Sequence, residues 1–317
     1  MAEKMQSIEN LIGRLKDLGF VNNKYDINVI QFLIDNNYYR VKEYFKYYKQ
    51  YMINANSQSS KSIDYSNVLK IYDLDSQLRN CLLYGIEIFE ITFRSRLIYY
   101  FLQNYSPYDY QNKKIYIDKY NTNKNLNYTD ELLKNINKWI SLSKDPNVLY
   151  CKKYKLKIPI WMAVEIMPFD TVSKIFRLLN SFDCKKDITM SFNITTHYED
   201  FEKMVRSIVV LRNTCAHHER LWCKNLHITP PITLQSKNVK NSYKNSNVIK
   251  TIILLSDAIS EIKQNEFFFR SINNILKKNK IFTGGIYNNG FKKDPPIVSL
   301  NQRPGGFLLK TVYQKIL

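Results

Sequence analysis

The placement of glycine is the feature that most constrains the fold of this 317-residue chain. Only Gly13, Gly19 and Gly85 precede residue 284, and the remaining five glycines lie within residues 284–306. Tight β-hairpin turns need residues at positive φ, a conformation that glycine adopts most readily. A sheet built from hairpins is therefore disfavoured over most of the chain. The sequence predicts an all-α fold.

Helical periodicity is strongest across residues 74–102, where apolar side chains recur in steps of three and four. These positions are Leu78, Leu82, Ile86, Phe89, Phe93 and Leu97. Further helices are predicted over residues 7–18, 26–48 (one long or two short), 129–143, 161–180, 198–220 and 248–278. Pro168 should interrupt the fourth of these. The polar stretches 104–128, 236–247 and 279–317 are predicted loops, the last with a short strand pair.

No internal repeat or sharp composition boundary divides the chain. The simplest organisation is one helical core with appended pieces. We predict an N-terminal helical segment over residues 1–60, the core over 61–280, and a Lys/Gly/Pro-rich tail over 281–317.

Net charge is the outlier of the composition. Lys and Arg number 47 against 28 Asp and Glu, which gives +19. Such a charge favours a polyanionic partner, with RNA or DNA first, although a bias toward lysine and asparagine would also produce it. The five cysteines are an odd number without a CxxC pair, as expected in a reducing compartment. With no apolar signal segment and no run of roughly 18 apolar residues, we expect a cytoplasmic protein without a membrane partner.

The stretch RNTCAHHERLW, from Arg212 to Trp222, carries an unusual density of chemically active side chains. On a helix, Asn213, His217 and Arg220 would form a stripe almost opposite the core face. That core face consists of Phe201, Met204, Val205, Ile208, Leu211 and Cys215.

These residue types suit RNA cleavage. An arginine such as Arg212 can hold a phosphate through two hydrogen bonds, and a histidine such as His217 can move the proton of a ribose 2′-hydroxyl. Asn213 can orient either group. Attack by the 2′-hydroxyl needs no protein nucleophile and no metal, so no cofactor is predicted. The alternative is structural, with a half-buried ion pair between Arg212 and Glu219 and histidines that cap the helix.

A zinc site is disfavoured in this region. Cys215 and Cys223 could be combined with His217 or His227, but their spacing matches no usual zinc motif.

The stretch RNTCAHHERLW resembles the signature of bacterial abortive-infection proteins of the AbiD/AbiF type, and it fits the R-x4–6-H motif of HEPN ribonucleases. Three further blocks resemble the same family in the same order. These are LIGRLKDLGF with NNYYRVKEYF (residues 11–20 and 36–45), the D-x-x-L-R…E-x-x-x-R helix (Asp75, Leu78, Arg79, Glu87, Glu90, Arg94), and PIWMAVEIMPFDTVSKIF (159–176). The chain departs from the pattern at Cys223, where asparagine is expected, and YRVKEYF lacks a glycine often found there.

The resemblance implies a HEPN-like helical bundle and an RNA-cleaving toxin of phage defence. It assigns catalysis to Arg212 and His217, with Asn213 and Arg220 as orienting groups and His218 as a second proton carrier. HEPN nucleases pair two motifs, so a chain with one motif implies a homodimer through the helix 198–220. A cognate small non-coding RNA is the implied partner beside the target RNA. The rival hypothesis is a non-catalytic RNA-binding module that scaffolds a structured RNA.

Val209 and Val210 could line that dimer interface or be buried within their own chain.

Candidate RNA-binding residues lie in two other places. Arg40, Lys42, Lys46 and Tyr44 combine cations with an aromatic ring, either as an RNA platform or as a helix with aromatics inside and cations outside. Lys277 and Lys278 would add non-specific phosphate affinity.

The carboxylates Glu87 and Glu165 are expected to be buried partners of Arg79 or Arg94.

Overall fold

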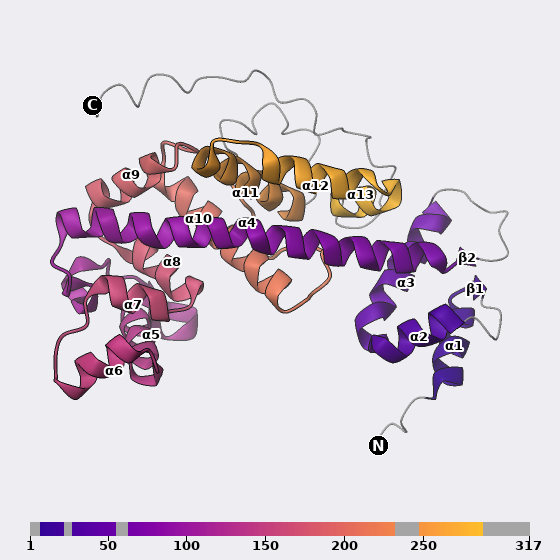
Figure 1. Ribbon diagram of the computed structural model, residues 1–317, viewed down its shortest axis with the longest axis horizontal. Coiled ribbons are helices and arrows are strands. Elements are labelled where there is room, and N and C mark those ends of the chain that lie inside the picture. Colours follow the sequence, from indigo (N-terminus) through magenta and orange to yellow (C-terminus); the bar gives the residue numbers. More distant parts are fainter. Residues whose placement is uncertain (1–6, 22–26, 55–62, 232–246, 288–317) are drawn as a thin grey trace.

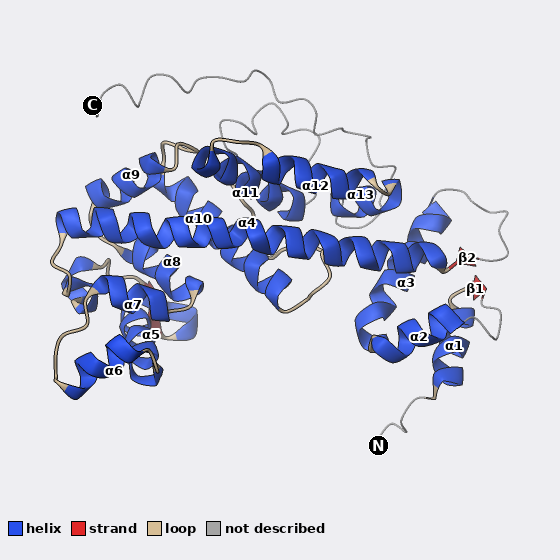
Figure 2. Ribbon diagram, in the orientation of Figure 1, coloured by secondary structure: helices blue, strands red, loops and turns tan. Residues whose placement is uncertain are grey.

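The computed structural model describes residues 7–21, 27–54, 63–231 and 247–287, and these are almost entirely helical (Figures 1 and 2). Among them, β-structure is limited to two short strand pairs and one isolated bridge between Tyr116 and Leu179. β1 (Phe20–Val21) runs parallel to β2 (Ile63–Asp64), and β3 (Tyr120–Asn121) is antiparallel to β4 (Leu126–Asn127). The predicted all-α class is confirmed.

The long helix α4 (Ser66–Asn104) is the central element, and most of the other helices, from α3 at one end to α9 at the other, pack along it (Figure 1). It contains no proline, and the predicted leucine, isoleucine and phenylalanine positions are all buried on it. The helix begins eight residues before the predicted start. Its single glycine, Gly85, allows a close approach, because a Cβ there would lie 2.3 Å from the Phe268 ring.

The N-terminal helices pack against one end of α4. They are α1 (Ile8–Asp17), α2 (Ile27–Asp35) and α3 (Tyr38–Asn54). Ser7 caps α1 by accepting a hydrogen bond from the backbone of Asn10. Asn37 does the same for Tyr39 at the start of α3, so the second of the two alternatives, a pair of shorter helices, is correct.

The other end of α4 is covered by a group of shorter helices. They are α5 (Tyr128–Leu142), α6 (Pro146–Lys153), α7 (Ile160–Ile166), α8 (Phe169–Leu178) and α9 (Phe182–Ser191). Pro168 separates α7 from α8 as predicted. The stretch before α5 is largely irregular, with three 3₁₀ turns (Asp109–Gln111, Lys113–Ile115, Thr122–Lys124).

Helix α10 (Tyr198–Ala216) carries the motif and packs on α4, α8 and α11. The predicted end at residue 220 was wrong, because the chain leaves the helix after Ala216. Val209 is buried within its own chain and Val210 is half-buried against the core, which removes Val209 from the proposed dimer contacts.

The C-terminal part of the described chain contains three helices where one was predicted. They are α11 (Asn247–Lys263), α12 (Phe267–Lys277) and α13 (Lys280–Tyr287). Gln264 at φ 53° ends the first of them. The loop predicted from residue 279 was wrong over α13, which contains Gly284 and Gly285 and packs on α4, α11 and α12. The rest of that stretch, together with most of the predicted loop 236–247, lies outside the described residues.

No helix within the described ranges is long and apolar enough to cross a membrane.

Candidate functional site

The helix α10 ends in a left-handed cap formed by the two adjacent histidines. His217 occupies the cap position, and His218 adopts a φ of 54°. The backbone N–H of Glu219 then donates to the Thr214 carbonyl at 2.9 Å, and that of His218 to Cys215 at 2.9 Å. This is the bonding expected when a left-handed residue closes a helix. Both imidazoles are consequently exposed at the helix end.

Arg212 and Asn213 lie together one turn before this cap. Both are half-buried, and the Arg212 Nη1 donates to the Asn213 Oδ1 at 3.3 Å. His217 lies four residues after Asn213, on the same face. No hydrogen bond or ion pair orients its imidazole among the described residues.

Arg220 is not part of this group, which corrects the predicted stripe. Because the helix ends before it, Arg220 turns inward and donates to the Trp222 carbonyl. Its guanidinium also lies 4.5 Å from the centroid of the Tyr47 ring. His218 is held through its carbonyl, which accepts a hydrogen bond from Arg40. The structure therefore brings Arg40 beside the motif, although sequence reasoning placed it in a separate group.

The segment after the histidines is fixed by the carboxylate of Asp75, which is completely buried on α4. Its oxygens accept the backbone N–H groups of Leu221 at 3.1 Å and Trp222 at 3.0 Å. They also accept the guanidinium of Arg79 and the phenol of Tyr44, each at 2.5 Å. Burial raises the pKa of the Asp75 carboxyl, while Arg79 and the other donors act in the opposite direction. One acid thus joins α3, α4 and the segment after the motif.

The position of Tyr44 corrects one predicted role. Its ring is buried and lies parallel to the indole of Trp222, with 6.1 Å between ring centroids. Burial raises the pKa of its phenol well above the ordinary value, and the charge of Asp75 adds to this. Tyr44 cannot stack on an RNA base. Lys46 is exposed and Lys42 lies 4.0 Å from the Tyr39 ring centroid, so these two cations remain accessible.

Lys277 and Lys278 are exposed at the end of α12, and Lys278 donates to Gln77 on α4 at 2.8 Å.

The predicted carboxylate partners were assigned wrongly. Glu219 pairs with Lys224, so the alternative ion pair with Arg212 does not form. Glu87 and Glu165 are exposed. Arg79 pairs instead with Asp75, and Arg94 with Glu90.

The cysteines near the motif are buried thiols. Burial raises the pKa of Cys215 to about 12, and it raises that of Cys223 further. No group of three or more His, Cys, Asp or Glu side chains arranged to hold a metal occurs in the described part of the chain.

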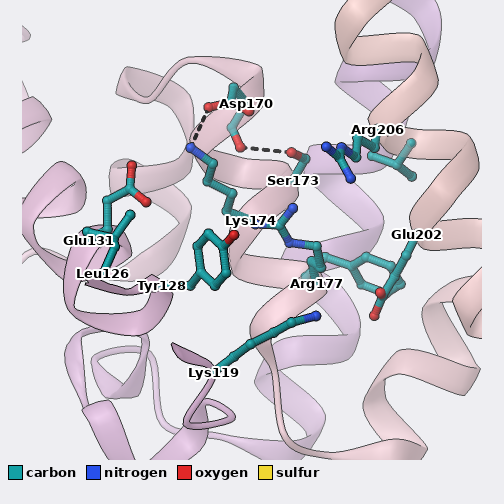
Figure 3. Close-up of a pocket in the computed structure, with 12 residues that line it drawn as sticks. Lys119, Leu126, Tyr128, Glu131, Asp170, Ser173, Lys174, Arg177, Glu202 and Arg206 are labelled. Atoms are coloured by element: carbon teal, nitrogen blue, oxygen red, sulfur yellow. Dashed lines mark hydrogen bonds and ion pairs between the residues drawn. The ribbon is translucent and has the colours of Figure 1, made fainter. Parts of the chain in front are cut away.

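A second concave region, which sequence reasoning missed, lies between α5, α8 and the first half of α10 (Figure 3). The pocket measures about 400 Å³. Its charged lining residues are Lys119, Glu131, Asp170, Lys174, Arg177, Glu202 and Arg206, and Tyr128 adds an aromatic ring. One signal was available in the sequence, because Arg206 lies seven residues before Asn213 and therefore on the same helical face.

The fold and this helix end define an all-α protein with Arg212, Asn213 and two exposed histidines at one helix terminus. The family model of Abi-like proteins matches residues 31–223, which is more than half of the chain. The chain therefore belongs to the Abi-like protein family, and this membership suggests a role in abortive-infection phage defence. No curated protein and no solved structure gave a significant match.

Proposed function

We propose that the protein is a HEPN-type endoribonuclease of the AbiD/AbiF type and acts as an abortive-infection toxin. Arg212 binds the scissile phosphate and neutralises its charge. His217 takes the proton of the ribose 2′-hydroxyl, whose oxygen then attacks the adjacent phosphorus. His218 gives a proton to the 5′-oxygen, which leaves as a hydroxyl, and a 2′,3′-cyclic phosphate remains.

The observation that carries this proposal is the arrangement at the end of α10. The half-buried Arg212 is held against Asn213, whereas His217 is exposed one turn further on. A held cation and an accessible imidazole on neighbouring turns are the two groups that internal phosphodiester cleavage requires.

A second copy would complete the site. His217 lacks an orienting partner among the described residues, and HEPN nucleases face two motifs toward each other. We therefore propose a homodimer across the exposed end of α10, which brings Arg212 and His217 of both copies together. A small non-coding RNA, encoded beside the protein, is the proposed regulator, and the +19 charge is compatible with such a partner.

The test compares His217→Ala with His227→Ala on the full chain. Both histidines are exposed, but only His217 lies in the motif. His217→Ala should lower the cleavage rate of labelled RNA at least about 100-fold in the presence of EDTA, because general acid–base catalysis contributes about 10²–10⁴-fold. RNA affinity should stay within about three-fold of the wild type, since one side chain contributes little to phosphate binding by a chain of net charge +19.

Two results would speak against the nuclease. Equal cleavage by both variants would remove His217 from the chemistry. RNA binding without any cleavage by the wild-type chain, also after co-expression with its flanking DNA, would instead favour the non-catalytic RNA-binding module.

A further inference from the structure

The pocket of Figure 3 and the motif share one accessible stripe of α10. The exposed or half-buried positions along this stripe are Glu199, Lys203, Arg206, Val210, Asn213 and His217. They alternate in steps of four and three, as positions on one helical face do. Arg206 lines the pocket, and His217 lies eleven residues further along, about 16 Å at 1.5 Å per residue.

The charges in the pocket leave cations in excess. Lys174 pairs with Asp170 at 2.8 Å (Figure 3), and Glu202 pairs with the buried Lys185 at 2.8 Å. The remaining charged lining residues are the cations Lys119, Arg177 and Arg206 and the single anion Glu131. None of these four forms an ion pair with another described residue.

An aromatic ring lies beside Arg177. Tyr128 is half-buried, and its phenolic oxygen accepts a hydrogen bond from Asn121 at 2.8 Å. The guanidinium of Arg177 lies 5.8 Å from the Tyr128 ring centroid. Flat guanidinium and phenol groups are the surfaces on which unpaired RNA bases stack. The volume of about 400 Å³ falls in the range of small-ligand pockets.

We propose that this pocket is a subsite for one nucleotide of the single-stranded RNA whose scissile phosphate lies at His217. Arg177 and Arg206 hold the phosphate of that nucleotide, and the base lies against Tyr128. This inference rests on the proposed function, because it names the substrate as a strand that extends along α10. A separation of about 16 Å corresponds to about five nucleotides at the roughly 3.4 Å per phosphate of a stacked strand.

The test measures the affinity of a fluorescein-labelled, 2′-O-methylated 12-nucleotide oligouridylate, which cannot be cleaved by internal attack. Arg177→Gln/Arg206→Gln should weaken its binding about ten-fold or more, since each arginine loses a charge-assisted contact. The slope of log affinity against log salt should fall by about 1.4, from two lost contacts at about 0.7 each on a single strand. A 4-nucleotide oligouridylate, too short to span motif and pocket, should bind both proteins equally in a competition assay that displaces a probe from the motif.

The matched control is Lys186→Gln/Lys263→Gln, which removes the same charge from exposed positions outside the pocket and outside the α10 stripe. If the control weakens binding as much as the double arginine variant, the subsite is refuted. Loss of ATP binding with unchanged oligouridylate binding would also refute it, because the pocket would then take a free nucleotide. Should the double variant fold poorly by circular dichroism, the exposed Arg206→Gln alone should reduce the slope by about 0.7.

The two proposals fail separately. Pocket-dependent oligouridylate binding by a chain that cuts no RNA would refute the nuclease and keep the subsite. If cleavage depends on His217, and neither cleavage nor binding changes when Arg177 and Arg206 are replaced, the subsite is refuted and the nuclease is retained.

Discussion

Asp75 holds the segment after the motif through a single carboxylate. It accepts the backbone N–H groups of Leu221 and Trp222 and the guanidinium of Arg79, which also donates to the Glu219 carbonyl at 3.5 Å. Leaving such donors unsatisfied costs more than the net gain of forming the bonds. The D-x-x-L-R pattern of α4 therefore has a structural role. Its aspartate, Asp75, fixes the backbone that follows His218, and its arginine, Arg79, pairs with that aspartate.

Replacing this acid should destabilise the protein strongly. Asp75→Asn should lower the free energy of unfolding by about 3–5 kcal/mol, because Arg79 loses its buried counter-charge. Asp73→Asn, two residues earlier and exposed on the same helix, should change it by less than about 0.5 kcal/mol. Urea unfolding of both variants checks this, and similar losses for the two would contradict the role given to Asp75.

The buried thiols should make the protein less stable in alkali. Burial raises the pKa of Cys184 and of Cys215 to about 12, whereas an unfolded cysteine loses its proton near about pH 8.5. The folded chain retains these protons longer, so stability falls as pH rises above about 8.5. Each thiol should account for about 1.4 kcal/mol at about pH 9.5.

Denaturant unfolding across this range tests the thiols. Cys184→Ala/Cys215→Ala should lose about 3 kcal/mol less than the wild type between about pH 7.5 and about pH 9.5. Val172→Ala replaces a buried residue that does not titrate. It should lower the free energy of unfolding equally at every pH and leave its pH dependence unchanged. Equal slopes for the wild type and the double variant would contradict the assignment.

At the scale of elements, α13 matters because it covers the segment after the motif. The Cys223 backbone N–H donates to the Gly285 carbonyl at 2.9 Å, and the Trp222 indole donates to Ile281 at 3.3 Å. A Cβ on Gly285 would lie 2.0 Å from the indole nitrogen. A side chain at position 285 would clash with Trp222, so this position requires glycine. Glycine occurs there although it has a low helix propensity.

Gly285→Ala should lower the free energy of unfolding by about 1–3 kcal/mol, as expected for an overpacked contact. Gly13→Ala in α1, where a Cβ would meet nothing within 4 Å, should instead raise it by about 0.5–1 kcal/mol. Thermal unfolding of the two variants separates packing from helix propensity, and stabilisation by both would show that Trp222 moves aside at no cost.

These elements also show how far sequence reasoning reaches. The periodicity of α4 and the interruption at Pro168 were predictable, because local patterns determine them. A histidine cap was one of the alternatives that the sequence left open. The inward turn of Arg220 and the helix around Gly285 were not predictable. They depend on partners distant in the sequence, Tyr47 and Trp222, and a local pattern carries no signal for such contacts. Arg212 and Asn213 were correctly placed together, whereas the pocket at Arg206 went unnoticed because three separate segments line it.

At the scale of the whole molecule, the blocks that resemble the abortive-infection family meet along α4. Arg79 binds the Asp75 that holds the segment after the motif, and Arg94 donates to the Val164 carbonyl of α7. The same helix therefore connects segments that are far apart in the chain, and α3, which packs on it, lies against the end of the motif.

The proposed dimer predicts a dominant effect of the inactive chain. If each site needs both copies, a three-fold excess of His217→Ala chains leaves few wild-type pairs, and cleavage should fall to less than half of that after equal dilution with buffer. Subunits are exchanged before RNA is added, and sedimentation confirms pairing. An equal excess of His227→Ala chains, which carry an intact motif, should raise cleavage. Unchanged activity with the His217→Ala chains would indicate independent sites in single chains.

The hydrogen bonds between α13 and the residues after the motif form late during translation. A ribosome completes the R-x4-H stretch well before it reaches Gly285, and at about 5–20 residues per second this interval lasts several seconds. Until then the nascent chain lacks the contacts that α13 makes with Trp222 and Cys223. The segment after the motif therefore gains its contacts with α13 only several seconds after the motif itself has been translated.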